Sequence, residues 1–198
     1  RRPVLRQDSA RDRIRDPHDQ GEALIMADRL AVMKDGRILQ TGRPEDIIYS
    51  PSDAWVAGFV GMDTVLSGTV VSRQQEFAVV EVGSRLIKAV LPPGVTGRVR
   101  IGIRPEEVML SRAFEPAGQP RQRAAANGPS AGPKPNENVF RGRITEVTPQ
   151  GLLLKIQLDC EFPLASLIPN ELMSGVGFRP GQVIDASFDP NAVCLIAD

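Results

Sequence analysis

The pattern of apolar and polar positions along this chain changes after Gly61. Before it, RLAVM (29–33) and RILQ (37–40) form apolar runs on either side of Lys34-Asp35-Gly36. An Asp-Gly pair between apolar runs predicts a β-hairpin, because both turn residues must accept positive φ.

Helices are predicted on both sides of this hairpin. A helix is expected from Asp19 to about Asp28, with Asp19 as its cap and apolar residues close to one face. Pro44 favours the first turn of a short helix, and Ser52 or Asp53 can cap another. Residues 1–16 are dominated by Arg and Asp, and we expect them to be irregular or loosely helical.

Beyond Gly61 the chain becomes a series of short β-runs punctuated by Gly and Pro. Residues 114–135 interrupt the series with a stretch rich in Pro, Gly and Ala, which is the composition of a flexible linker. A short helix is expected around 170–173. The predicted strands are TVLSGTVVS, FAVVEV, RLIKAVL, GRVRIGI and EVMLS before the linker, and NVFRGRITEV, GLLLKIQLD, FPLASLI, GQVIDASF and AVCLIA after it.

The two β-blocks resemble each other. Residues 65–70 and 139–144 share the pattern apolar, apolar, x, Gly, x, apolar, and residues 104–110 and 189–195 share x-Pro-x-x-Val-x-Leu. One block is therefore predicted to be a divergent copy of the other. About five short strands in each copy suit a small OB-like barrel, and barrels this small are expected to pack together or against a second chain.

Composition narrows the function classes. Lys+Arg and Asp+Glu both number 24, and aromatics are scarce, so neither a nucleic-acid binder nor a membrane-surface binder is favoured. The two cysteines, Cys160 and Cys194, are far apart and indicate a reducing compartment. With no run of 18 apolar residues and no signal peptide, the expected location is cytoplasmic.

The stretch from His18 to Gly61 contains short motifs in a fixed order: His18-Asp19-Gln20, Ala27-Asp28-Arg29-Leu30-Ala31-Val32-Met33, Asp35-Gly36-Arg37-Ile38 and Phe59-Val60-Gly61. In order and spacing these motifs resemble the C-terminal end of the ATP-binding subunit of an ABC importer. The resemblance implies that His18 matches the switch histidine that reaches the γ-phosphate of ATP, which an imidazole N–H is suited to do.

The β-blocks after Gly61 carry further stretches of this kind. FVGMDTVLSGTVVS and VRIGIRPEEVML resemble the first repeat of the TOBE domains attached to such subunits, and NENVFRGRITEV, LLLKIQLDCEFPLASLI and GVGFRPGQVIDASF resemble MOP domains of the molybdate/tungstate-binding type. The expected fold is mainly β, with tandem small OB-like barrels preceded by a short α/β remnant of a nucleotide-binding domain. The expected divisions are 1–61 for the remnant, 62–113 for the first barrel, 114–135 for the linker and 136–198 for the second barrel.

Several motifs of the ATPase core are absent from this sequence. There is no GxxxxGK[ST] phosphate loop, no LSGGQ-like signature and no apolar strand ending in Asp-Glu. Arg13-Ile14-Arg15-Asp16 stands where the family has a buried strand, and Pro17 replaces a threonine. We therefore expect a C-terminal fragment or truncated product that is not an enzyme and holds no cofactor, whereas a full-length relative would use ATP and magnesium.

An oxyanion-binding site is a more specific hypothesis than a purely structural docking or dimerisation module. A tetrahedral dianion needs N–H groups, hydroxyls and a cation in a partly desolvated cleft. Of the family's Ser-x-Arg-Asn stretch only Asn138 is kept, and Asp189 stands where the Lys-Ala-Ser stretch has its lysine. The candidates from this resemblance and from the surrounding strands are Asn138, Ser166, Ser187, Arg143 and Lys155. Structural roles on solvated strand faces are the alternative for Arg143 and Lys155.

The predicted function is the regulatory and dimer-contact region of an importer subunit for molybdate or tungstate. The expected partners are a second copy of the chain, membrane permease subunits at the inner face of the membrane and the oxyanion itself. Three alternatives stay open: a free-standing molbindin-like oxyanion-binding protein, the TOBE region of a sugar or polyamine importer, and a nucleic-acid-binding OB module. The charge balance disfavours the last of these.

Overall fold

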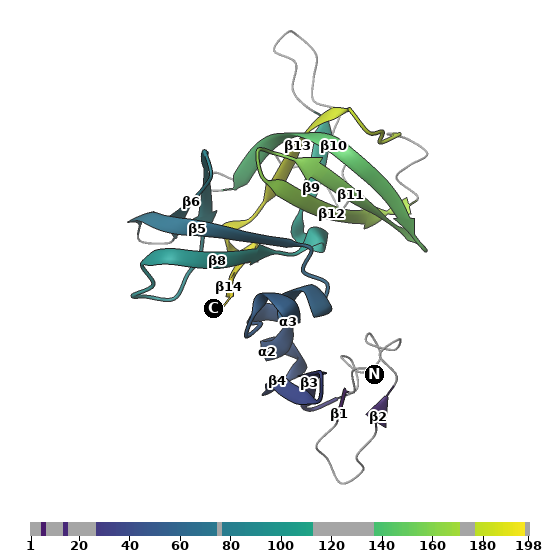
Figure 1. Ribbon diagram of the computed structural model, residues 1–198. Coiled ribbons are helices and arrows are strands. Elements are labelled where there is room, and N and C mark those ends of the chain that lie inside the picture. The colour runs from purple at the N-terminus through teal and green to yellow at the C-terminus, as the bar shows by residue number, and fades with distance from the viewer. Residues whose placement is uncertain are drawn as a thin grey trace, which may run out of the picture. The chain divides into compact units, whose positions relative to one another are not determined.

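The computed structural model describes residues 27–74, 77–112, 137–170 and 177–196, together with two short strands, β1 (Leu5–Arg6) and β2 (Ile14–Arg15) (Figure 1). By compactness the chain divides into two units, residues 1–61 with 195–198 and residues 62–194. His18, the linker over 114–135 and most of the helices predicted over 19–28 and 170–173 fall outside the described residues. β1 pairs antiparallel with β2, in a stretch where neither strand was predicted, because two-residue strands leave no periodic pattern.

The first unit contains the predicted hairpin. Strands β3 (Leu30–Lys34) and β4 (Arg37–Gly42) pair antiparallel around Asp35 and Gly36, whose φ angles are 49° and 79°. Two consecutive positive φ angles are the signature of the turn that joins right-twisted strands closely. The Asp-Gly prediction is therefore confirmed.

Two short helices follow in the same unit. Helix α2 (Pro44–Tyr49) begins at the predicted proline, and α3 (Ala54–Phe59) is capped by Asp53, whose Oδ1 accepts the Val56 N–H at 2.8 Å. The Gln40 amide holds the loop between them, accepting the Ser52 N–H at 2.8 Å and donating to the Ser50 carbonyl at 2.9 Å. The buried core of this unit consists of Leu30, Val32, Ile47 and Val56.

The second unit contains two five-stranded antiparallel sheets of the same design. The first sheet has the order β14-β8-β5-β6-β7 and the second the order β12-β11-β10-β13-β9. The strands before the linker are β5 (Thr64–Arg73), β6 (Ala78–Val82), β7 (Arg85–Ala89), β8 (Gly97–Ile103) and β9 (Met109–Arg112). The strands after it are β10 (Asn138–Gln150), β11 (Leu153–Asp159), β12 (Pro163–Pro169), β13 (Val183–Phe188) and β14 (Val193–Ile196).

The two repeats exchange their last strands. β9 lies beside β13 of the second sheet and β14 lies beside β8 of the first, so each sheet is completed by the other repeat (Figure 1). The crossing points are two 3-10 turns, η2 (Pro105–Glu107) and η4 (Pro190–Ala192), which coincide with the repeated x-Pro-x-x-Val-x-Leu pattern. The predicted mainly β fold with tandem OB-like units is confirmed, and the exchange interleaves its two repeats.

The repeated glycine has a steric cause. A Cβ added at Gly68 would lie 2.7 Å from the Glu81 carbonyl oxygen and 2.6 Å from a Val80 methyl carbon. A Cβ at Gly142, its counterpart in the second repeat, would collide with the Cys160 sulfur. Both glycines stand where a long coiled strand passes closely over its neighbour, and the repeats keep them because no side chain fits there.

Candidate functional site

Asn138 joins the two sheets of the second unit. It is the first residue of β10, and its side chain is 4% exposed. Its Oδ1 accepts the Lys88 N–H at 2.8 Å, and its Nδ2 donates to the Lys88 carbonyl at 2.9 Å. Lys88 lies on β7, at the edge of the first sheet. The Asn138 side chain thus binds the Lys88 backbone with two hydrogen bonds, as a neighbouring strand would. We call this pair of bonds the Asn138 clamp.

A second clamp occupies the equivalent place in the other repeat. Thr64 aligns with Asn138, and the strand registers align Lys88 with Ala165. The Thr64 Oγ1 accepts the Ala165 N–H at 2.9 Å, and both residues are buried. Each repeat therefore uses the first residue of its longest strand to hold the third strand of the other repeat.

Ser166 and Ser187 have different surroundings. The Ser166 hydroxyl is fully buried and donates to the Val108 carbonyl at 2.7 Å, which fixes the segment between η2 and β9. Ser187 pairs with Val139, whereas Asn138 pairs with Phe188. Adjacent positions on a strand point to opposite faces, so Ser187 and Asn138 cannot converge on one ligand.

Both candidate cations, Arg143 and Lys155, already bind other groups of the protein. Arg143 is exposed and donates to the Gly181 carbonyl at 2.9 Å. The Lys155 ammonium lies 2.6 Å from the Asp63 carboxylate, in an ion pair whose side chains are 21% and 32% exposed. The structure therefore does not gather the five candidate side chains into one site: Arg143 binds a backbone carbonyl and Lys155 a carboxylate.

The charge beside each clamp is opposite in the two repeats. Asp189 comes directly before η4, and its Oδ1 accepts the Asn191 N–H at 2.9 Å. Its counterpart Arg104 comes directly before η2, is buried, and forms an ion pair with Glu106 at 3.0 Å. The Arg104 ion pair thus ties the residue before η2 to a residue within it.

The β6–β7 turn of the first repeat and the β11–β12 turn of the second also meet. The Glu161 carboxylate accepts hydrogen bonds from the Ser84 hydroxyl and, at 2.6 Å, from the Arg85 guanidinium. The Ser84 hydrogen bond, followed by the Arg85 charge, lowers the pKa of Glu161. Together with the two clamps, this contact links the repeats at their edges and at their turns.

Neither cysteine is placed for chemistry. Burial raises the pKa of the Cys160 thiol to about 11, and burial also raises the pKa of Cys194. A thiol kept protonated is a poor nucleophile and a poor metal ligand. Among the described residues, no group of three or more His, Cys, Asp or Glu side chains could hold a metal ion. No helix in the described part of the chain is long and apolar enough to cross a membrane.

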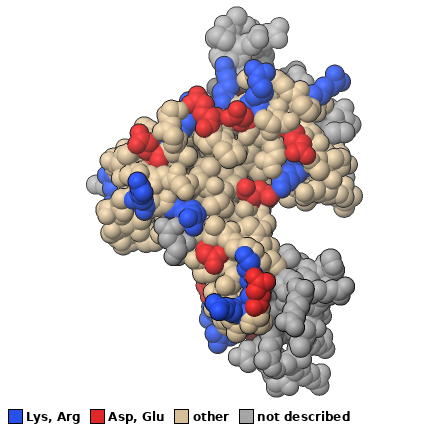
Figure 2. Space-filling view, viewed as in Figure 1, with Lys and Arg blue, Asp and Glu red and all other residues tan. Residues whose placement is uncertain are grey.

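Charges of both signs are interspersed on the face of the molecule that Figure 2 shows. Figure 2 shows Lys and Arg side chains alternating with Asp and Glu on the face in view. The balance seen in composition thus extends to this part of the surface.

The sequence did not predict which groups Asn138 and Ser166 bind. Lys88 and Val108 contribute backbone groups only, and a backbone group leaves no residue signature. Thr64 had a usable signal, because the repeat places a hydrogen-bonding residue immediately before each aligned segment.

Comparisons with known proteins give one family and several relatives. The TOBE domain family matches residues 134–195. The molybdate/tungstate import ATP-binding protein WtpC of Pyrococcus horikoshii is 29% identical over 177 residues, which cover 89% of this chain and 44% of that protein. The spermidine/putrescine import ATP-binding protein PotA of Oleidesulfovibrio alaskensis is 38% identical over 181 residues, covering 83% of this chain and 43% of that protein. The chain thus spans less than half the length of these curated relatives.

A solved structure shares the fold. The cytoplasmic molybdate-binding protein ModG, crystallised with molybdate bound, superposes with a TM-score of 0.50 at 16% identity. The match covers 69% of this chain and 96% of ModG. At this identity the likeness establishes the arrangement of strands.

Proposed function

The chain is homologous to the C-terminal part of the ATP-binding subunits of ABC importers and carries a TOBE domain at residues 134–195, and we propose that it serves as the regulatory and dimer-contact region of such a subunit. The observation that carries the proposal is the strand exchange between the repeats. Because each sheet is completed by a strand of the other repeat, the two sheets form one close-packed body that can pass a conformational change from one repeat to the other. The partners in this proposal are a second copy of the chain and the membrane permease subunits of the importer.

The proposed role is not catalytic. The sequence contains no phosphate loop, signature motif or magnesium-binding strand, so ATP hydrolysis belongs in this proposal to a complete subunit. His18 keeps its proposed contact with the γ-phosphate only in that context.

The proposed cargo of the importer is a tetrahedral oxyanion, molybdate or tungstate. Support comes from WtpC, whose alignment runs through 89% of this chain, and from the fold shared with a molybdate-binding protein.

A polyamine is the second candidate cargo. PotA is 38% identical over 83% of this chain, and Asp189 places a carboxylate where an oxyanion site would have a cation. A carboxylate at short range repels a dianion and attracts an ammonium group.

Neutralising Asp189 separates the two cargoes. Asp189→Asn keeps a side-chain oxygen that can accept the Asn191 N–H while removing the charge. Asp159→Asn is the matched control, because Asp159 Oδ1 accepts the Glu161 N–H in the same i+2 geometry at 3.0 Å. If the cargo is an oxyanion, Asp189→Asn raises the thermal shift produced by tungstate and the control does not. A spermidine shift that falls in Asp189→Asn, with no tungstate response in either variant, would replace the oxyanion by a polyamine.

A further inference from the structure

The outer face of the second sheet exposes apolar side chains in register. By the pairing of β9, β13 and β10, one row across this face contains Met109, Ser187 and Val139, and the next contains Ser111, Asp185 and Arg141. A third row begins with Val183 opposite Arg143. Val139, Met109 and Val183 are 46%, 43% and 40% exposed. We call these eight residues the outer face.

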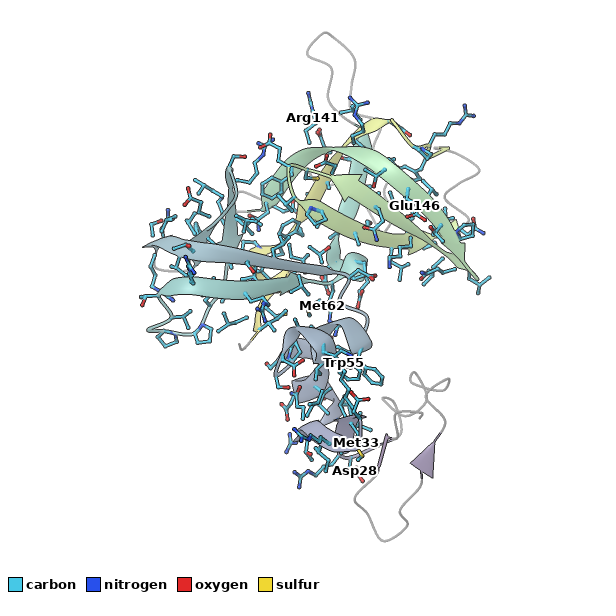
Figure 3. All side chains as sticks on the ribbon, viewed as in Figure 1. Asp28, Met33, Trp55, Met62, Arg141 and Glu146 are labelled. Carbon is cyan, nitrogen blue, oxygen red and sulfur yellow. The ribbon has the colours of Figure 1, made fainter. Side chains whose placement is uncertain are left out.

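The equivalent face of the first sheet is closed by the chain itself. There Val65 pairs with Gly102, the repeat aligns Cys194 with Met109, and the Cys194 sulfur lies 3.6 Å from the Gly102 carbonyl oxygen. The Met62 side chain is 2% exposed and its sulfur lies 3.6 Å from the Cys194 sulfur (Met62 is labelled in Figure 3). The residue aligned with Met62 in the second repeat is Asn136, a polar amide. The comparison shows that this position of the fold accepts an apolar cover, and that the second repeat does not encode the same one.

The charges on the outer face are self-complementary. Arg141 Nε lies 3.2 Å from the Asp185 carboxylate in the middle row, with side chains 56% and 18% exposed. In Figure 3 the Arg141 label lies at the outer side of the sheet formed by β10 and β13. Apolar residues stand on both sides of this pair, with Val139 and Met109 at one end and Val183 at the other. Arg143 lies at the rim and donates to the Gly181 carbonyl.

We propose that a second copy of this chain covers the outer face, through a two-fold contact centred on Arg141 and Asp185. A two-fold axis between these residues sets each guanidinium against the other copy's carboxylate and lays the apolar end of one face on the apolar end of the other. An anionic surface such as nucleic acid would instead select an excess of cations, whereas this face places a carboxylate at its centre. This inference rests on the dimer contact of the proposed function and names its surface.

Sedimentation velocity of the full chain over a range of concentrations tests the proposal. The wild type is expected to form a dimer, and Val139→Asp is expected to weaken it at least tenfold. Leu86→Asp is the matched control, because Leu86 is 56% exposed on β7 of the other sheet. Far-UV circular dichroism verifies that each variant keeps its strands.

A charge exchange makes the test independent of folding. Arg141→Asp alone brings two carboxylates together and is expected to dissociate the dimer, whereas Arg141→Asp combined with Asp185→Arg restores it. A dimer that persists in Val139→Asp and in Arg141→Asp overturns the surface and leaves the proposed function standing. A wild type that stays monomeric at every concentration overturns the dimer contact of the proposed function as well.

Discussion

Replacing Asn138 by alanine removes both bonds of the larger clamp. The Lys88 N–H and carbonyl, now at 2.8 and 2.9 Å from the amide, lose their partners next to a side chain that is 4% exposed. A buried polar group left unsatisfied costs about 1–3 kcal/mol. Lys88 is half-buried, so water can recover part of that loss, and we expect Asn138→Ala to lower the free energy of unfolding by about 2–4 kcal/mol.

Urea unfolding followed by far-UV circular dichroism measures this change, because the strands of the second unit dominate the signal. The single tryptophan, Trp55, and the single tyrosine, Tyr49, both lie in the first unit, so their fluorescence reports the unit that carries no substitution. The slope of free energy against urea should stay unchanged, since the surface exposed on unfolding is the same. Asn191→Ala is the control, because the Asn191 amide bonds only locally, to Asp189 at 2.7 Å. Equal, small losses of under about 0.5 kcal/mol in both variants would refute the clamp.

Three further predictions concern the strand crossing at Gly68 and the Cys160 thiol. Gly68→Ala should destabilise the chain by about 1–3 kcal/mol, because its Cβ would lie 2.7 Å from a backbone oxygen that cannot move aside, and an unchanged urea midpoint would show that the crossing has room. For Cys160 the folded state holds the pKa at about 11 against an ordinary 9.0, so the unfolded state loses its proton first as pH rises. Stability should therefore fall as pH rises from about 9 toward 11, and Cys160→Ser should flatten that fall. Iodoacetamide at pH 9 should label Cys160 only after unfolding, and rapid labelling of Cys160 itself in the folded chain, located by peptide mapping, would contradict its burial.

Local chemistry made several elements predictable. The Asp35-Gly36 turn follows from two adjacent residues that tolerate positive φ. The start of α2 follows from a single residue, Pro44, because proline suits the first turn of a helix. The repeat was visible because Gly68 and Gly142 meet the same steric demand in both copies.

The strand exchange could not be predicted in this way. β9 and β14 carry the same x-Pro-x-x-Val-x-Leu pattern, so either strand satisfies the inward face of either sheet. Alternation sets which side of a strand is buried, but it does not set which sheet the strand joins.

Which candidate side chains share a face is set by the register of the strands, and the sequence alone does not give that register. Asn138 and Ser187 were both candidates for one anion site, yet the pairing of Asn138 with Phe188 puts them on opposite faces. Lys155 was a candidate cation for that site, yet the fold brings Asp63, 92 residues away in sequence, to 2.6 Å from its ammonium. Partners this distant in sequence are set by tertiary packing, which residue patterns do not record.

Isothermal titration of the chain with tungstate and molybdate tests the central claim most directly, with sulfate, phosphate and spermidine as comparisons. The account predicts saturable binding of tungstate and molybdate, with little heat from the other three. Saturable binding of spermidine alone, or no saturable binding of either metal oxyanion, would contradict it.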